Sequence, residues 1–398
     1  MKKIMLLGGS IQQIAAIETA KKLGYYTVLC DFLTDNPGQY LVDKFYLVST
    51  TDKEAVLDVA IKEKIDGILA YASDPAAPTA AYVAEKLCLP TNPYKSVEIL
   101  CNKDLYREFL KENGFNTPFA MSFTKFEDAK KSFSNFKLPV IIKPVDSSGS
   151  KGVSRIDKIS ELEDCFATAM RFSRNKTVII EEFVEKFGYQ VAGDGMVLDG
   201  ELVFRCFAND HFNPKCENPF VPIAASFPYN MPEKVHNKIH NEIQRLITKL
   251  NMKSGTYNFD IRIDKDLNVY LMEIAPRSGG NYIPQIIQYA TGVDLAEYAV
   301  EIAMGKKISK IDLVPAKGYY SYFAIHSLKN GVLKSIEISE EAKKCIVEEH
   351  IAVKKGDSVR AFTGANTRLG ILIMNFENEK QMLDMMDNSE KWISVNLE

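Results

Sequence analysis

The sequence lacks the features that mark metal-rich, disulfide-linked or membrane proteins. Its seven cysteines form no C-x-x-C pair, which argues against zinc ligation and against a disulfide framework. Its five histidines show no metal-site spacing. No apolar run approaches membrane-spanning length, and residues 3–8 lead straight into Gly8 and Gly9, which indicates a strand rather than a signal peptide. We therefore expect a cytoplasmic protein with no membrane partner.

An excess of either charge is also missing. The 398 residues carry 49 Lys or Arg and 52 Asp or Glu, a net charge of −3, so a general nucleic-acid surface is not expected. Hydrophobic residues make up 46% and charged residues 25% of the chain, the proportions of an ordinary globular protein. This length supports two or three domains with full cores.

The first third of the chain alternates strands and helices. A strand at 2–7 leads through Gly8, Gly9 and Ser10 into a helix at 11–23 and a strand at 26–31, which predicts a doubly wound parallel sheet. The G-x-G-x-x-G spacing is absent, so NAD binding is disfavoured. A third unit follows at 53–64, 67–71 and 76–87, and we interpret Asp74 before its second helix as a helix cap.

The remaining chain is expected to form an α/β and α+β fold in several units. A breaker cluster at 89–93 ends the first domain, and residues 209–228, with four prolines and little periodicity, are predicted to be a loop. Strands at 318–325, 352–353 and 369–374 with a helix at 379–387 predict a separate small α+β domain. The predicted domains are 1–92, 93–185, 186–313 and 314–398.

Residues 255–281 carry the pattern on which the function depends. With period two they form a β-hairpin, with one polar and one apolar face. The polar face carries Asn258, Asp260, Arg262 and Glu273, and the apolar face carries Phe259, Ile261, Ile263, Tyr270, Met272 and Ile274.

A turn centred between residues 266 and 267 of this hairpin places Asp260 directly opposite Glu273. Their Cβ atoms would then lie roughly 5 Å apart, where two carboxylates repel unless a cation lies between them. Mg²⁺ or Mn²⁺ suits such a pair when phosphate oxygens complete the coordination. The alternative is a pair of solvated acids aided by Arg262. Arg277 and the flexible turn of Ser278, Gly279, Gly280 and Asn281, which suit an anionic group, favour the metal site.

Three features upstream are typical of nucleotide binding. Lys103 opens a helix and Lys143 ends a buried strand at 138–144, although either lysine can be simply solvated. The loop after Lys143 contains Ser148, Gly149, Ser150, Lys151 and Gly152, and can fold its N–H groups and ammonium over phosphates. It leads into another strand rather than a helix, so it is not a Walker A loop. An ordinary Gly/Ser-rich hairpin turn is the alternative.

A strand at 177–185 ends in paired acids beside apolar residues. Its end can serve an adenine, with an acid accepting from the amino group and an apolar side chain as a wall. By itself this is an ordinary strand end. The residues concerned are Glu181, Glu182, Phe183 and Val184.

The order of these motifs resembles the ATP-grasp ligases, which include carbamoyl phosphate synthetase and biotin carboxylase. The resemblance covers nearly the whole chain and implies ATP and Mg²⁺ (or Mn²⁺) as cofactors. It implies phosphate binding by Lys103, Lys143 and the 147–152 flap, adenine binding by Glu181 to Val184, and metal binding by Asp260 and Glu273. The family's usual ribose acid is absent, which leaves Gln190 or Glu185 as candidates. Ala275 replaces an Asn found in many members.

Residues 273–284 with 290–295 are most similar to the bacterial L-amino acid ligases. This implies that Arg277 contacts the substrate carboxylate or acyl phosphate, with Lys151 as a second catalytic cation and residues 278–281 binding substrate. The implied enzyme joins a small-molecule carboxylate to an amine through an acyl phosphate, and a homodimer is expected. Alternatives are a purine-pathway ligase similar to phosphoribosylglycinamide synthetase, a bicarbonate-phosphorylating carboxylase, and a regulatory protein that binds ATP without turnover.

Overall fold

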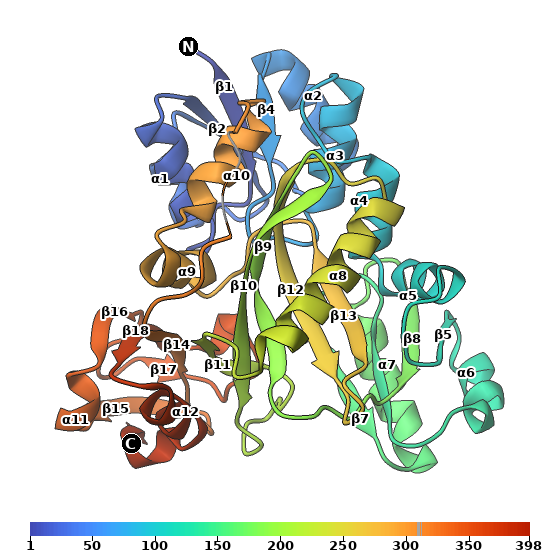
Figure 1. The fold of residues 1–398 in the computed structure, drawn as a ribbon, viewed down its shortest axis with the longest axis vertical. Helices are drawn as coiled ribbons and strands as arrows, with labels where there is room; N and C mark the ends of the chain where they lie inside the picture. Colours follow the sequence, from blue (N-terminus) through green and yellow to red (C-terminus); the bar gives the residue numbers. More distant parts are fainter. Residues whose placement is uncertain (309–310, 312) are drawn as a thin grey trace.

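The computed structural model describes residues 1–308, 311 and 313–398. Its N-terminal part is a parallel sheet in the order β3 (Lys44–Leu47), β2 (Tyr26–Asp31), β1 (Lys3–Leu7) and β4 (Gly67–Leu69). Helix α1 (Ile14–Lys22) connects β1 to β2, α2 (Lys53–Glu63) connects β3 to β4, and α3 (Ala77–Lys86) follows β4 (Figure 1). The apolar run of β1 is almost wholly buried, as expected for a parallel strand covered on both faces. The predicted doubly wound parallel sheet is therefore confirmed.

A small antiparallel sheet follows two short helices, α4 (Tyr94–Cys101) and α5 (Lys103–Glu112). Its strand order is β5 (Ala120–Phe123), β8 (Val178–Glu182), β6 (Val140–Pro144) and β7 (Ser154–Ile156). Helices α6 (Phe126–Ser132) and α7 (Leu162–Phe172) pack their apolar stripes on one face of it. The loop between β6 and β7 is therefore a hairpin connection, as the sequence predicted.

The largest sheet contains eight strands in the order β13-β12-β9-β10-β11-β14-β18-β16. Their bounds are β9 (Gln190–Leu198), β10 (Glu201–Phe212), β11 (Pro222–Phe227), β12 (Gly255–Ile263), β13 (Val269–Ala275), β14 (Tyr319–Ile325), β16 (Ile346–Ile351) and β18 (Gly370–Phe376). Helix α8 (Glu233–Lys249) lies across one face (Figure 1). Helices α9 (Ile283–Thr291) and α10 (Leu295–Ala303) follow the hairpin, and α9 packs on the opposite face.

Two sequence predictions about this sheet were wrong. Residues 209–228 are not all loop, because β10 runs on to Phe212 and β11 occupies Pro222–Phe227. The strand predicted at 352–353 lies instead at Ile346–Ile351. Strands buried on both faces show no polar alternation, so β11 carried little periodic signal.

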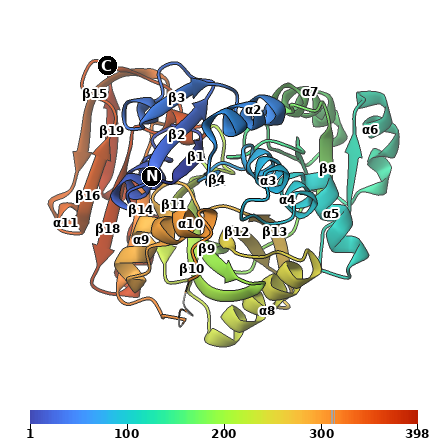
Figure 2. The same cartoon turned by 90° about the horizontal axis from the view of Figure 1, so that it is seen from above.

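The C-terminal part is continuous with the large sheet, because β14, β16 and β18 are three of its strands. Beside them, β15 (Gly331–Ile338), β17 (Ser358–Val359) and β19 (Ile393–Leu397) form a second sheet, accompanied by α11 (Glu340–Lys343) and α12 (Glu379–Asp387). Figure 2 shows this part and the α5–α7 part on opposite sides of the molecule. The domain boundaries remain predictions, and the end of the third predicted domain includes residues 309, 310 and 312, which lie outside the described residues.

The β12–β13 hairpin pairs Asp260 with Glu273, as predicted. The register changes directly afterwards, because Ile261 pairs with Leu271 and Met272 is the extra residue of a β-bulge. The bulge reverses the faces on the turn side, so Val269 and Leu271 enter the core while Met272 borders the cavity described next. The prediction that Tyr270 and Met272 lie on the apolar face was therefore wrong.

Candidate active site

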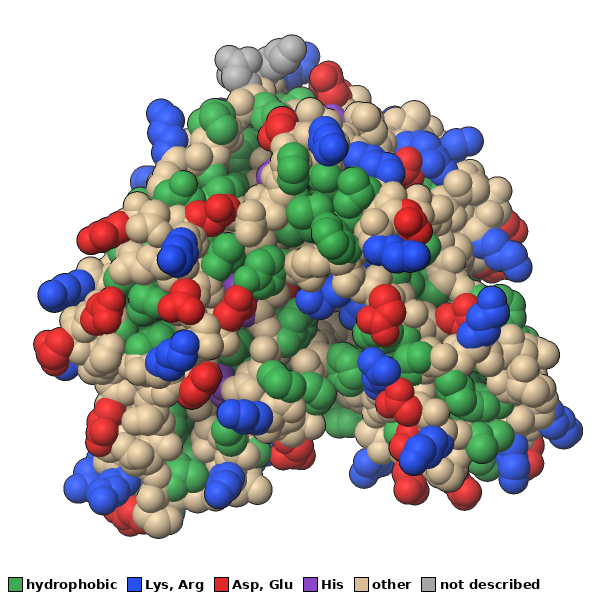
Figure 3. Space-filling view, turned by 60° about the horizontal axis from the view of Figure 1, so that its bottom comes forward, with side chains coloured by type: hydrophobic (Ala, Val, Ile, Leu, Met, Phe, Trp, Pro, Cys, Tyr) green, Lys and Arg blue, Asp and Glu red, His purple; other side chains and the backbone are tan. Residues whose placement is uncertain are grey.

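A cavity of about 120 Å³ lies between the small sheet and the large sheet. The face that points down in Figure 1 is hollowed there, and Lys or Arg side chains lie along the hollow (Figure 3). Most residues that the sequence predicted for nucleotide binding line this cavity: Lys103, Lys143, Ser148, Gly149, Ser150, Lys151, Glu181, Glu182, Val184, Gln190, Asp260 and Glu273. Segments far apart in the sequence therefore meet at one place.

The two acids of the hairpin lie opposite each other at the cavity. Burial, reinforced by the charge of Glu273, raises the pKa of Asp260 to about 6. The Oδ1 atom of Asp260 is buried without a hydrogen-bond partner among the described residues. Glu273 faces Lys103, whose Nζ lies 3.1 Å from its Oε2. A buried carboxylate oxygen with no donor beside a second carboxylate fits a hard divalent ion such as Mg²⁺.

Lys103, Arg107 and Lys143 lie around the carboxylates of Glu181 and Glu273 at one side of the cavity. Lys143 pairs with Glu181, and Arg107 Nε donates to Glu181 Oε2 at 2.9 Å. Burial alone would raise the pKa of Glu181, but Arg107 and Lys143 lower it to about 2. Burial, with Arg107 and Lys103 nearby, lowers the pKa of Lys143 although Glu181 opposes this. A surplus of buried positive charge of this kind favours an anionic ligand.

Sequence reasoning missed Arg107. It lies one helical turn after Lys103 on α5, so the i, i+4 spacing of two cations was the signal that could have identified it. Its side chain is 3% exposed, and its two Nη atoms have no hydrogen-bond partner among the described residues.

The loop between β6 and β7 is anchored to the segment between β10 and β11 by contacts at Ser150. Ser150 Oγ donates to the carbonyl of Phe220 at 3.0 Å, and Asn218 Nδ2 donates to the carbonyl of Ser150 at 2.9 Å. Ser150 has a φ of 55°, in the left-handed region. Gly152 is not among the cavity-lining residues and packs against Phe172 instead. Lys151 lines the cavity and is exposed.

The adenine end of the predicted site is only partly as expected. Glu181 is committed to two cations, so it has little capacity left for an adenine amino group. The ring of Phe183 lies between Arg155 and Arg262, each guanidinium 4.7 Å from its centroid, and does not line the cavity. Glu182, Val184 and the bulge residue Met272 do line it.

Of the two candidates for the ribose contact, only one borders the cavity. Gln190 lines it, and its Oε1 accepts from Arg262 Nε at 3.0 Å. Glu185 is exposed and is not among the lining residues.

Arg277 is tied to the N-terminal part of the chain. Its Nε and Nη2 donate to the two carboxylate oxygens of Asp74 at 2.7 Å each, and its Nη1 donates to the carbonyl of Ser278 at 3.0 Å. Burial alone would raise the pKa of Asp74, but the Arg277 charge holds it below its usual value. The helix-cap interpretation of Asp74 was therefore wrong, since α3 begins after Ala76 and has no side-chain cap.

The four residues after Arg277 are placed differently from one another. Ser278 is fully buried, 0% exposed, with its Oγ 2.8 Å from Thr256 Oγ1, so it faces the core rather than a ligand. Gly279 N donates to Asp194 Oδ2 at 2.7 Å. Gly279, Gly280 and Asn281 line a separate cavity beside α1.

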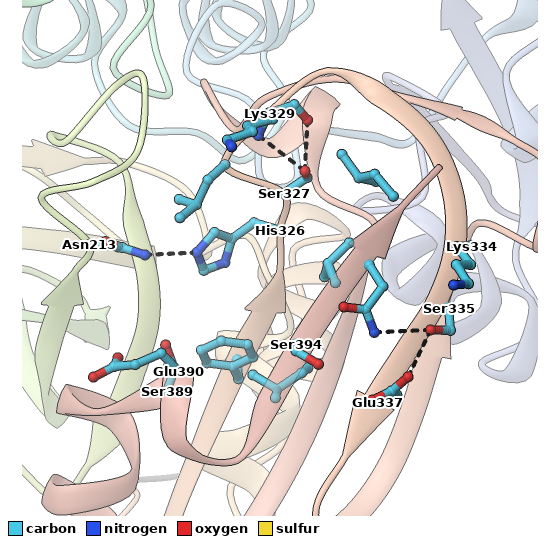
Figure 4. A pocket seen from close by; sticks show the side chains of 16 residues that line it. Asn213, His326, Ser327, Lys329, Lys334, Ser335, Glu337, Ser389, Glu390 and Ser394 are labelled. Carbon is cyan, nitrogen blue, oxygen red and sulfur yellow. Dashed lines mark hydrogen bonds between the residues drawn. The ribbon is translucent and has the colours of Figure 1, made fainter.

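A larger hollow lies away from all of these groups. It has a volume of about 630 Å³ and is bordered by β15, β19 and the segment after β14 (Figure 4). His326 Nε2 lies 3.2 Å from Asn213 Nδ2 on its wall. None of the residues predicted for the site lines it, so size alone does not identify the chemically active cavity.

The described part of the chain shows neither a larger metal cluster nor a membrane-spanning helix. Within it, no group of three or more His, Cys, Asp or Glu side chains is arranged to hold a metal ion, so Asp260 and Glu273 stand as a pair. None of the described helices combines the length and apolar character needed to cross a lipid bilayer.

Comparison with known proteins agrees with this geometry. Carbamoyl phosphate synthase large chain from Caldanaerobacter subterraneus subsp. tengcongensis is 28% identical over 275 residues, which cover 68% of this chain and 24% of that one. The chain thus spans about a quarter of the length of such relatives. Formate-dependent phosphoribosylglycinamide formyltransferase from Prochlorococcus marinus is 29% identical over 189 residues, covering 46% and 48% of the two chains.

Two solved structures share the fold over the whole chain. L-amino acid ligase from Bacillus licheniformis has a TM-score of 0.81 and 20% identity, covering 100% of this chain and 99% of that one. Phosphoribosylglycinamide synthetase from Anaerococcus prevotii has a TM-score of 0.74 and 22% identity, covering 100% of both chains. The family model "Carbamoyl-phosphate synthase L chain, ATP binding domain" matches residues 102–311, and this chain therefore belongs to that ATP-grasp family.

Proposed function

We propose that this protein is an ATP-dependent carboxylate-amine ligase. It forms an amide or peptide bond through an acyl phosphate, releases ADP and phosphate, and uses an amino acid as a substrate. The observation that carries this proposal is the direct pairing of Asp260 with Glu273 beside Lys103 and Lys143. The family model supports the ATP site, and the L-amino acid ligase fold supports the class of substrate.

The reaction has two balanced steps. A carboxylate oxygen of the first substrate forms a bond to the γ-phosphorus while the bond to the ADP oxygen breaks. An amine nitrogen then forms a bond to the acyl carbon, the carbon–oxygen bond to phosphate breaks, and the amine proton passes to the departing phosphate. Such transfers depend on positioning and charge neutralisation more than on covalent help from the protein.

The residues of this chain divide those tasks. Asp260 and Glu273 would hold Mg²⁺, which when bound neutralises phosphate charge. Lys103 and Lys143 bind phosphate oxygens, and the 147–152 loop with Lys151 covers them and keeps water from the acyl phosphate. Arg277 would contact the reacting carboxylate, and its guanidinium is oriented by Asp74.

The direct test is Glu273→Gln with ATP, Mg²⁺ and a panel of amino acids. We expect amino-acid-dependent ADP release to fall by at least about 1000-fold, because a neutral amide leaves the cation with a single carboxylate. Glu112→Gln is the matched control, since Glu112 is exposed at the end of α5. Full activity of Glu273→Gln would refute the metal assignment.

A phosphoribosyl substrate is the second candidate, because relatives and fold neighbours include proteins named for phosphoribosylglycinamide. Phosphoribosylamine with glycine is its diagnostic substrate pair, and bicarbonate-dependent ADP release would indicate a carboxylase. ATP binding with no ADP formation from any of these substrates would indicate a regulatory protein.

Measurement of the molar mass in solution tests the expected homodimer.

A further inference from the structure

We propose that the cavity between α1 and the Gly279–Tyr282 segment receives a large apolar side chain of an amino-acid substrate and rejects a sugar phosphate. The inference rests on the proposed function and specifies its substrate class. The cavity has a volume of about 210 Å³. One wall carries Ile11, Ile14, Ala15 and Glu18, and the opposite wall carries Gly280 and Asn281.

The wall formed by α1 and the residues before it is mainly apolar. Ile14 and Ala15 are only half-buried, and Ile11 is 52% exposed although it is a large aliphatic residue. Aliphatic side chains left open around a concave site are typical of ligand pockets, in which a few polar groups fix orientation. An apolar group entering this space would bury surface that the protein leaves open to water.

The opposite wall belongs to the same loop as the reacting centre. Gly279 is two residues after Arg277, so their Cα atoms are at most about 7.6 Å apart. Gln12 Oε1 accepts from Asn281 N at 3.3 Å, and a Cβ on Gly280 would lie 2.1 Å from that oxygen. A side chain at Gly280 would therefore have to displace the side-chain amide of Gln12. This wall of the cavity thus lies two residues along the chain from Arg277, whose guanidinium is held by Asp74.

The turn before α1 offers no anion site. Gly9 N donates to Asp31 Oδ2 at 2.7 Å, and Ser10 N donates to Gln13 Oε1 at 2.9 Å. Backbone N–H groups that bind phosphate in Gly-rich turns must be free, and these two already have partners.

The charges around the cavity also favour an apolar side chain over a phosphate group. Its lining residues include the acid Glu18 and no Lys or Arg. Arg368 donates to Asn281 Oδ1 and does not line the cavity. A phosphate group would therefore meet a carboxylate and an apolar wall, whereas a Leu, Met or Phe side chain would meet matching surface.

The test compares L-leucine, L-methionine and L-phenylalanine with glycine on the full-length chain with ATP and Mg²⁺. The two readouts are the dissociation constant from calorimetry and the amino-acid concentration that gives half-maximal phosphate release. We expect the large apolar amino acids to bind at least about tenfold more tightly than glycine, the discrimination typical of added methylene groups in an apolar pocket.

Ala15→Phe fills the cavity, and Thr19→Phe on the same helix but outside the cavity is the control. Ala15→Phe should weaken binding of the large amino acids by about 10- to 100-fold and change that of glycine less than about twofold. Thr19→Phe should change neither, and thermal unfolding establishes that both variants fold. Should Ala15→Phe fail to unfold cooperatively, Ile14→Ala takes its place, with an expected loss of at least about threefold for leucine alone.

Three results would overturn the inference: no large apolar amino acid binds, all amino acids bind alike, or Ala15→Phe affects glycine and leucine equally. Binding or turnover of phosphoribosylamine by the unmodified protein would also overturn it. If amino acids stimulate ADP release but Ala15→Phe changes this release equally for all of them, the cavity assignment alone is refuted. The ligase proposal is tested separately by Glu273→Gln, and it fails if that variant retains activity.

Discussion

Asp260 shows how one residue's environment fixes its chemistry. Its pKa is raised to about 6 by burial, so its charged form is disfavoured in the absence of a cation. In the unfolded chain an Asp has a pKa of about 3.9. The contribution of Asp260 to the stability of the metal-free protein is thus fully present below about pH 4 and is lost as the pH rises through about 6.

The same shift predicts a pH dependence of metal binding. A cation needs the carboxylate, so Mn²⁺ affinity should fall about tenfold for each unit of pH below about 6 and level off above it. Electron paramagnetic resonance of free Mn²⁺ measures this directly. Asp260→Asn should bind Mn²⁺ weakly at every pH. A wild-type affinity that is flat between pH 5 and 7 would contradict the assignment.

At the scale of elements, the β6–β7 loop depends on its link to the segment between β10 and β11. Asn218 donates to the Ser150 carbonyl, and the Ser150 hydroxyl donates to Phe220, so the loop is anchored from outside its own hairpin. Loops with few buried contacts open readily unless such anchors hold them.

Removal of these anchors should therefore free the loop. For the double variant Ser150→Ala and Asn218→Ala we expect limited proteolysis within residues 147–152 to accelerate at least about threefold, with a higher KM for ATP. ATP with Mg²⁺ should protect the wild type more than the variant. Ser335→Ala, in the C-terminal sheet, is the control, and equal cleavage rates in all three proteins would show that the anchors do not hold the loop.

At the scale of the whole molecule, Asp74 and Arg277 join the N-terminal sheet to the β12–β13 hairpin. Their side chains are 16% and 10% exposed, and the pair is bidentate. Breaking such a pair by removing one partner leaves an uncompensated charge and typically destabilises a protein by about 3–5 kcal/mol.

Asp74→Asn is accordingly expected to lower the free energy of unfolding by about 3 kcal/mol. Asp74→Asn combined with Arg277→Met should lose clearly less than the sum of the two single losses, because neither charge remains unpaired. Denaturant unfolding of the four proteins gives the coupling energy. Additive losses would mean that the two groups stabilise the protein independently.

The sequence alone determined the local order of this protein. Period-two alternation placed the hairpin and predicted Asp260 opposite Glu273. The turn is centred on Asp266 rather than between residues 266 and 267, because Ile263 pairs with Val269, so the pairing of the two acids depends on the bulge at Met272. The βαβ order of the first third likewise predicted the parallel sheet. The order of the motifs identified the ATP-grasp family, which the family model confirmed.

Only the tertiary structure decided which side chains meet across the chain. Asp74 and Arg277 are separated by 203 residues, and Arg107 and Glu181 by 74, so no periodic pattern relates them. The bulge at Met272 and the burial of Ser278 likewise depend on packing against other elements. Periodicity reports the environment of each element, whereas ion pairs and cavities arise where separate elements meet, and the relative placement of those elements is set by the packing of the whole core.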